Sequence, residues 1–337
     1  RNEGIRCCSH FNKIQLPSSL QHSACLPIVI SKSDPFYSPH NIKCMGFVRS
    51  NIISNNPNQI EIGEQVNTVT SHIDLSTVYG SDYKTMQKIR SYNGGRLRTN
   101  TKNILPFENG IYFSGDDQVN QTPFIAIWHS LFIRNHNNLA DKLAIINRNW
   151  DEEKLFQEAR KINIAIYQKI IYEEWISLFL GANTSQRLSL ANYDSNINAS
   201  TANEFSTAAF RFINSFINSE FQTLDHEMNK RTFNYSDTIM KSKMLESYYD
   251  DILRGFLNQK MNLVGYSSEI LNKMYKNKKQ IGLDLLSIDI QRGRDHGLPA
   301  YHKYRKMCNM RANIKVFNDL FPHVPKNAIT QLRQTYK

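Results

Sequence analysis

Two neighbouring segments with helical periodicity, residues 122–146 and 151–181, place the strongest constraint on what this chain can fold into. Pro123 suits the first turn of a helix, because the N–H that proline lacks would have no helical partner there. After it, apolar side chains recur every three or four residues, the spacing of one helix face: Phe124, Ile127, Trp128, Leu131, Leu139, Leu143 and Ile146. We predict that this stripe packs in the protein core.

The second segment is predicted to be a helix that begins after Asp151, a suitable N-cap, and ends at Gly181. Its apolar positions are also predicted to be core: Leu155, Ala159, Ile162, Ile166 and Ile170. Alternating patterns typical of strands are few and short in the rest of the chain. The sequence therefore predicts a mainly α protein with many helices, long ordered loops and little β-structure.

Four of the five cysteines, Cys7, Cys8, Cys25 and Cys44, lie in the first 44 residues, among turn-forming residues. This clustering favours two local disulfides and an oxidising, extracellular compartment. Adjacent cysteines do not readily pair, so Cys7 and Cys8 should each bond either Cys25 or Cys44, and both pairings stay open. Zinc binding is the competing interpretation, but the spacing matches no common zinc pattern.

The charge distribution bears on the kind of partner to expect. The formal net charge is +11, yet the 41 Lys and Arg residues are scattered among 30 Asp and Glu residues without a dense basic run. Scattered charge is typical of a solvated surface, so we expect no nucleic-acid partner. No apolar run approaches the roughly 20 residues that cross a bilayer, so we also expect no transmembrane segment.

Three motifs spaced along the chain are specific enough to indicate a family. Residues 129–140 read HSLFIRNHNNLA, residues 205–216 read FSTAAFRFINSF, and residues 291–299 read QRGRDHGLP. These motifs resemble those of the animal haem peroxidases, the group of myeloperoxidase, thyroid peroxidase and peroxinectin. The resemblance runs from about Cys7 to the last residue and implies the multi-helix fold of that family. It also implies that His129 and His136 are structural.

The resemblance implies that residues 1–337 form one partial haem-peroxidase domain. The helix that carries the family's distal histidine would precede Arg1, and a C-terminal part would follow Lys337. Cys308 falls on a family cysteine whose partner comes later in the chain. We therefore expect Cys308 to be either a free buried thiol or the partner of a cysteine beyond Lys337.

On the proximal side of the haem, two positions differ from the family pattern. The histidine that ligates iron falls on Asn214, and the asparagine that hydrogen-bonds this histidine falls on Asp289. A carboxamide is a poor axial ligand, because its lone pairs are weakly basic compared with those of a neutral imidazole. Arg211 and Arg292, which belong to the same proximal frame, are retained.

On the distal side, two more positions differ. The arginine that stabilises the departing hydroxide falls on Gln118, and the glutamate that forms an ester with the haem falls on Gln121. Gln118 can donate a hydrogen bond but has no positive charge with which to stabilise an anion. Gln121 has no carboxylate with which to form an ester.

Residues 65–81 contain oxygen-bearing side chains at short intervals, which suits a hard cation such as calcium. The resemblance places Thr70, Asp74 and Ser76 on the family's calcium ligands, with His72 contributing its main-chain carbonyl. One further ligand, an aspartate beside the distal histidine, would lie before Arg1. Without the resemblance, an ordinary Ser/Thr-rich turn before a helix would explain the pattern equally well.

These substitutions favour a catalytically degenerate, secreted peroxidase-like protein that has a binding or adhesion role toward an extracellular protein partner. The alternative is an active haem peroxidase that uses hydrogen peroxide to oxidise small reductants in oxidative-stress or host-defence chemistry. In that case another residue must ligate iron, and the nearest histidine in sequence to Asn214 is His226, in a polar loop. The resemblance implies haem and calcium as cofactors, and Asn214 argues against the haem.

Overall fold

Helices make up most of the regular structure and the strands are short, as predicted. The computed structural model describes residues 4–9, 14–53, 63–189, 193–262, 265–308 and 314–336. The α-helices are α1 (Ser76–Tyr79), α2 (Tyr83–Ile89), α3 (Pro123–Ile146), α4 (Glu152–Lys169), α5 (Ile176–Leu180), α6 (Ala182–Ser189), α7 (Asn203–Thr207), α8 (Tyr235–Thr238), α9 (Leu245–Asn258), α10 (Ser268–Asn272), α11 (Leu285–Asp295), α12 (Tyr301–Met307) and α13 (Lys326–Thr335).

In the described part of the chain, four antiparallel strand pairs accompany these helices. The strands are β1 (Ile28–Val29), β2 (Cys44–Met45), β3 (Ile52–Ile53), β4 (Glu64–Gln65), β5 (Phe107–Glu108), β6 (Ile111–Tyr112), β7 (Glu220–Leu224) and β8 (Lys230–Asn234). The other helical segments, of the 3-10 type except for the π-helical η5, are η2 (Ser18–Leu20), η3 (Ser38–His40), η4 (Asp117–Asn120), η5 (Ile170–Trp175), η6 (Ala209–Phe216), η7 (Ser242–Met244) and η8 (Phe317–Leu320). Within these described ranges, no helix combines the length and the apolar character that a membrane crossing requires.

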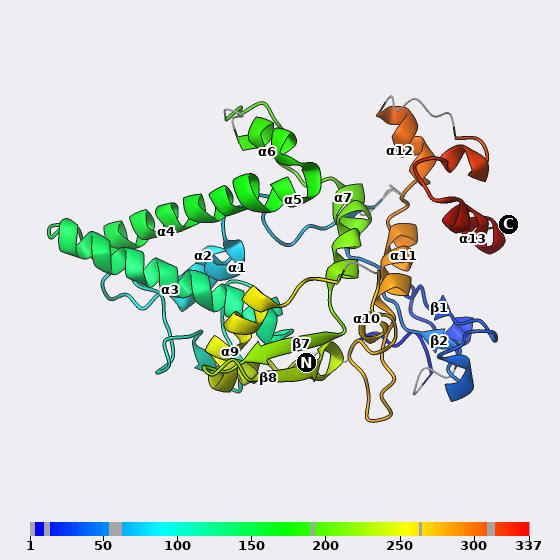
Figure 1. Cartoon of the computed structure of the whole chain (residues 1–337), viewed down its shortest axis with the longest axis horizontal. Helices are drawn as coiled ribbons and strands as arrows, with labels where there is room; N and C mark the ends of the chain where they lie inside the picture. The colour runs from blue at the N-terminus through cyan, green and yellow to red at the C-terminus, as the bar shows by residue number, and fades with distance from the viewer. Residues whose placement is uncertain are drawn as a thin grey trace.

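The two predicted long helices are confirmed, and they lie side by side as a helical hairpin (Figure 1). The side chain of Thr122 accepts a hydrogen bond from the backbone N–H of Ile125 at 3.3 Å, which caps α3. Asp151 caps α4 in the same way, through the N–H of Lys154 at 2.8 Å. The second helix is interrupted by the π-helical turn η5 and resumes as α5, which ends at Gly181 with φ +79°.

The prediction that both apolar stripes are entirely core is wrong at several positions. Phe124 and Ile127 are buried, but Trp128 is 54% exposed and Ile146 is 76% exposed. On the second helix, Ile166 and Ile170 are also exposed. Helix periodicity shows which side chains share a face, whereas burial depends on how much of that face neighbouring elements cover. Here α3 packs on α4 and α9, and these neighbours leave part of the stripe in contact with solvent.

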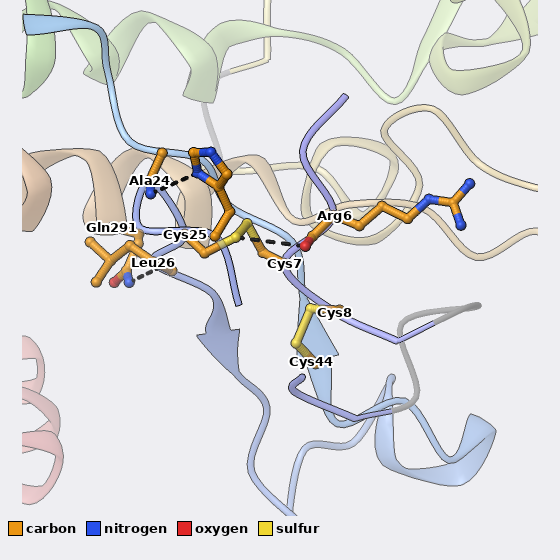
Figure 2. Close-up of a disulfide and its surroundings, with 9 residues drawn as sticks. Arg6, Cys7, Cys8, Ala24, Cys25, Leu26, Cys44 and Gln291 are labelled. Atoms are coloured by element: carbon orange, nitrogen blue, oxygen red, sulfur yellow. Dashed lines mark hydrogen bonds between the residues drawn. A yellow bond between two sulfur atoms is a disulfide. The ribbon is translucent and has the colours of Figure 1, made fainter. Parts of the chain in front are cut away.

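The four N-terminal cysteines form two disulfides, as predicted, and the structure resolves their pairing. Cys7 bonds Cys25 and Cys8 bonds Cys44 (Figure 2). The Gln291 side chain on α11 donates a hydrogen bond to the carbonyl of Leu26 at 3.0 Å. The disulfide-bonded segment is thereby attached to α11. Cys308 is exposed and has no disulfide partner among the described residues, so the expectation of a buried thiol is wrong, and a partner beyond Lys337 stays a prediction.

A chain of buried hydrogen bonds joins α1, α3 and α4. The Asn163 amide donates to the Tyr79 hydroxyl at 2.9 Å, and this hydroxyl lies 2.8 Å from Nδ1 of His136. Nε2 of His136 lies 2.8 Å from the Gly95 carbonyl, which can only accept, so Nε2 carries the proton and Nδ1 accepts from Tyr79. His129 is also buried, and its Nδ1 is hydrogen-bonded to Ser114 Oγ at 2.9 Å. Both histidines thus have the structural contacts that the resemblance implied.

We expect protein stability to fall as the pH drops from about 6.5 to 4. Burial lowers the pKa of His129 and of His136 from 6.5 to about 4. Between these values the unfolded chain binds protons that the folded chain does not, so each histidine removes up to about 3 kcal/mol of stability across this window. Urea unfolding at pH 7, 6, 5 and 4.5 measures the loss. A free energy of unfolding that stays constant from pH 7 to 5 would contradict the prediction.

Helix α9 lies against strand β7, which pairs with β8 as an antiparallel hairpin (Figure 1). Arg254 Nε donates to the carbonyl of Leu224 at 2.8 Å, and the Gln259 side chain donates to the carbonyl of Glu220 at 2.7 Å. A Cβ atom at Gly255 would lie 1.9 Å from the carbonyl oxygen of Gln222. The helix can therefore approach the strand this closely only because position 255 has no side chain.

Candidate functional site

The structure brings together the two proximal positions that the resemblance assigned. Asn214 lies near the end of η6, and Asp289 lies on α11. Although 75 residues separate them, the Asn214 amide nitrogen donates a hydrogen bond to Asp289 Oδ2 at 2.9 Å. Asp289 is buried and Asn214 is partly buried. The two residues thus form a polar contact between the two elements that would carry a proximal ligand and its partner.

The two retained arginines of the proximal frame have different contacts. Arg211 Nη1 lies 3.8 Å from Asp289 Oδ1. Burial raises the pKa of Asp289 above its ordinary value, while the charge of Arg211 and the hydrogen bond from Asn214 act in the opposite direction. Arg292 instead donates to Ser50 Oγ at 2.8 Å, and its guanidinium lies 4.7 Å from the centre of the Phe47 ring. It therefore joins α11 to residues 47–50, which follow Cys44.

The proximal residues do not fit an iron ligand. A haem peroxidase requires a strong axial donor, and the nitrogen of Asn214 is committed as a hydrogen-bond donor to Asp289. Only the weakly basic amide oxygen remains. His226, the nearest histidine in sequence, is 85% exposed at the β7–β8 turn, where it lies beside Glu227. His129 and His136 are held in the buried hydrogen bonds described above.

The two distal positions lie next to each other, at and just after η4, and neither carries a charge. Gln118 is exposed, and its backbone N–H donates to Asp116 Oδ1 at 2.9 Å. Gln121 is half-buried, and its side-chain nitrogen donates to the Tyr275 hydroxyl at 3.2 Å. No motif or periodic pattern includes Tyr275, so its contact with Gln121 was not predictable. Gln121 thus has a tyrosine contact at the position where a haem ester would form.

The four predicted calcium-binding residues line one cleft of about 480 Å³, together with Asp116 and Asp117. Thr70 Oγ1 accepts a hydrogen bond from the backbone N–H of His72 at 3.1 Å. Asp74 Oδ1 accepts from the N–H of Ser76 at 3.0 Å. In the part of the chain that the structure describes, no three His, Cys, Asp or Glu side chains are grouped to hold a metal. The calcium role of this loop therefore stays a prediction.

The fold is of the peroxidase type, as shown by the helical architecture, the α3–α4 hairpin and the contact between η6 and α11. At position 214 of the proximal frame, the side chain is an amide and not an imidazole. A family model described as animal haem peroxidase matches residues 1–337. The chain belongs to the animal haem peroxidase family, which confirms the resemblance seen in its motifs.

Similar proteins agree with this assignment. The chain is 34% identical over 340 residues to "Peroxidase" of Drosophila melanogaster, an alignment that covers 91% of this chain and 49% of that protein. It is 33% identical over 331 residues to "Chorion peroxidase" of the same organism, covering 90% of this chain and 41% of that protein. The chain thus spans about half the length of these relatives.

A solved structure shows the same fold. Peroxidase A from Dictyostelium discoideum superposes with a TM-score of 0.81 at 26% sequence identity. The match covers 94% of this chain and 66% of that chain. The mainly α fold predicted from the sequence is therefore confirmed by a structure of the same family.

Proposed function

We propose that this protein is a catalytically degenerate member of the animal haem peroxidase family with a secreted binding or adhesion role. The observation that carries the proposal is the hydrogen bond from Asn214 to Asp289, which occupies the proximal position with a residue unsuited to iron. Without a strong axial ligand, haem iron has no anchor at this position.

The distal positions support the same proposal. Peroxide cleavage requires a group that moves a proton between the two oxygens and a charge that stabilises the departing hydroxide. The side chains of Gln118 and Gln121 are neutral, and the Gln121 amide donates to the Tyr275 hydroxyl. These residues supply neither the charge nor an ester link to haem.

A secreted location is part of the proposal. The disulfides Cys7–Cys25 and Cys8–Cys44 support it, because such bonds persist in oxidising compartments. Calcium bound by Thr70, His72, Asp74 and Ser76 would stabilise the loop before α1. An extracellular protein is a partner consistent with this location.

Family membership favours the alternative function, an active peroxidase that oxidises small reductants with hydrogen peroxide. A haemin titration of the protein in its natural full-length form separates the two functions. We expect no stoichiometric Soret band, no spectral change on adding peroxide and no oxidation of a phenolic reductant. A saturable Soret band at one haem per chain that shifts with peroxide would overturn the proposed function.

A further inference from the structure

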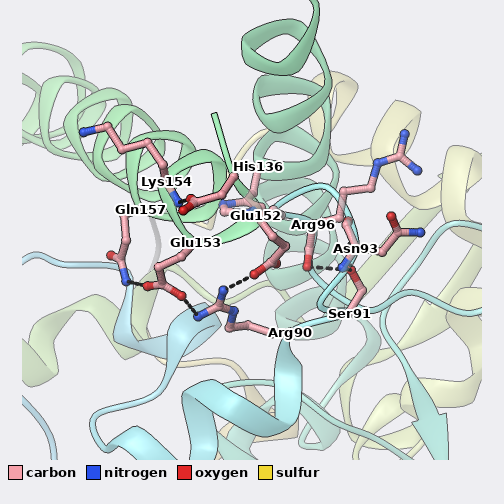
Figure 3. Close-up of polar contacts among 11 residues, drawn as sticks. Arg90, Ser91, Asn93, Arg96, His136, Glu152, Glu153, Lys154 and Gln157 are labelled. Carbon is pink, nitrogen blue, oxygen red and sulfur yellow. Dashed lines mark hydrogen bonds and ion pairs between the residues drawn. The ribbon is translucent and has the colours of Figure 1, made fainter. Parts of the chain in front are cut away.

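A second cleft, of about 580 Å³, lies between the turn at residues 91–99 and the face of α3. Its lining includes Ser91, Asn93, Arg96, Arg134 and Asp141. Figure 3 shows Ser91, Asn93 and Arg96 on one turn, beside the ion pairs of Arg90 with Glu152 and Glu153 that fix this turn to α4. The predicted haem and calcium positions are not among the residues that line this cleft.

Arg96 has hydrogen-bonding capacity to spare. Its Nε lies 2.5 Å from Asp141 Oδ1, and both residues are about half exposed. Neither terminal nitrogen of Arg96 has a hydrogen-bond partner within the described residues. The paired terminal nitrogens of a guanidinium match the two oxygens of a carboxylate or sulfate, so Arg96 can bind such a group without breaking its contact with Asp141.

Arg134 adds a cation that no carboxylate neutralises. Its Nε donates to the carbonyl of Asn103 at 2.6 Å, and its guanidinium lies 3.9 Å from the centre of the Tyr249 ring. It forms no ion pair within the part of the chain that the structure describes. Arg98 also lines the cleft and is paired with Glu108. Three arginines and one aspartate therefore line this cleft, which favours an anionic ligand.

The neutral side chains of the cleft suit hydroxyl groups. Asn93 and Asn138 line it, and their side chains make no hydrogen bond to any other described residue. The side chain of Asn137, by contrast, accepts a hydrogen bond from the N–H of Leu97 and donates one to its carbonyl. A free carboxamide offers both donors and an acceptor, which is the complement of a sugar hydroxyl. No aromatic side chain is among the lining residues, so the cleft lacks the aromatic platform on which single-stranded nucleic acids usually stack their bases.

We propose that this cleft binds an acidic oligosaccharide that carries sulfate or carboxylate groups. Arg96 and Arg134 bind the anionic groups, and Asn93 and Asn138 contact the hydroxyls. This assignment rests on the proposed binding role and names the chemical class of its partner. It uses none of the residues at the haem positions, so haem content and oligosaccharide binding are measured independently.

The test is calorimetric titration of the protein with a heparin-derived octasaccharide at physiological salt. Inorganic sulfate and a single-stranded DNA octamer are titrated in parallel. We expect saturable binding of the octasaccharide, weaker by at least about tenfold in Arg96→Gln because a charge-assisted contact is lost. Asp141→Asn should tighten binding roughly two- to fivefold, because the carboxylate no longer competes for Arg96.

Arg187→Gln is the matched control, because it removes one exposed arginine on α6, outside the cleft. If Arg187→Gln weakens octasaccharide binding as much as Arg96→Gln does, net charge alone attracts the ligand, and the proposal that the cleft is the binding site is wrong. Binding of sulfate or DNA as tight as that of the octasaccharide, or no binding at all, also overturns it. Thermal melting confirms that each variant is folded, and the haemin titration above reports separately on the proposed function.

Discussion

Asn214→His is expected to bind haem more tightly than the natural protein, for which we propose that no haem is bound. The residue at position 214 already donates a hydrogen bond to Asp289, and a histidine there would donate its own ring N–H to the same carboxylate. Such a carboxylate partner orients an imidazole and increases its basicity as a metal ligand. We expect haemin binding at least about tenfold tighter than in the natural protein, with an imidazole-type Soret band in the absorption spectrum.

Asn218→His is the control for this experiment. Asn218 lies four residues later and is also partly buried, but its amide donates to the carbonyl of Lys260 at 2.9 Å and not to a carboxylate. A histidine there tests whether any added imidazole captures haemin. If Asn218→His binds haemin as tightly as Asn214→His, position 214 has no special relation to the haem site. If the natural protein already binds as tightly as Asn214→His, the proposed function is wrong.

Gly255→Ala is expected to be strongly destabilising. The added Cβ would lie 1.9 Å from the Gln222 carbonyl oxygen, well inside van der Waals contact, so α9 would have to move away from β7. Overpacking of this kind costs roughly 3 kcal/mol, and it outweighs the gain of about 1 kcal/mol that alanine brings to a helix interior. Urea unfolding monitored by circular dichroism measures the change.

Gly293→Ala is the matched substitution, because it also replaces a helical glycine. A Cβ at Gly293 on α11 would meet only a side-chain atom of Leu298 at 3.8 Å, an ordinary contact. Helix propensity then acts alone, and we expect unchanged or slightly increased stability. Equal effects of the two substitutions would show that the contact between α9 and β7 relaxes freely.

Local signals made the long helices predictable. Thr122 and Asp151 are side-chain caps that act within three residues, so their sequence pattern determines where α3 and α4 begin. Exposure of Trp128 was not predictable, because it depends on which distant elements cover that helix face. The disulfide pairing was open for the same reason: cysteine spacing restricts the choice, and only the folded path of the chain decides it.

The residues of the candidate site could be predicted where motifs aligned this sequence with the family. The motifs assigned related roles to Asn214 and Asp289, and the structure places them in contact. The contact of Gln121 with Tyr275 had no local signal, because it joins residues 154 positions apart. The cleft lined by Arg96, Arg98 and Arg134 was not predicted. These arginines belong to the turn at residues 91–99 and to α3, so they form no cluster in the sequence.

The hydrogen-bond chain through Asn163, Tyr79 and His136 has a consequence for how this family diverges. It ties three helices together and closes on the backbone at Gly95, without using positions 118, 121, 214 or 289. The residues of this hydrogen-bond chain are therefore different from the residues that would hold the cofactor. Mutations at the haem positions therefore leave these core hydrogen bonds intact. A family member that no longer binds haem can still fold, and its fold is then available for the evolution of another activity.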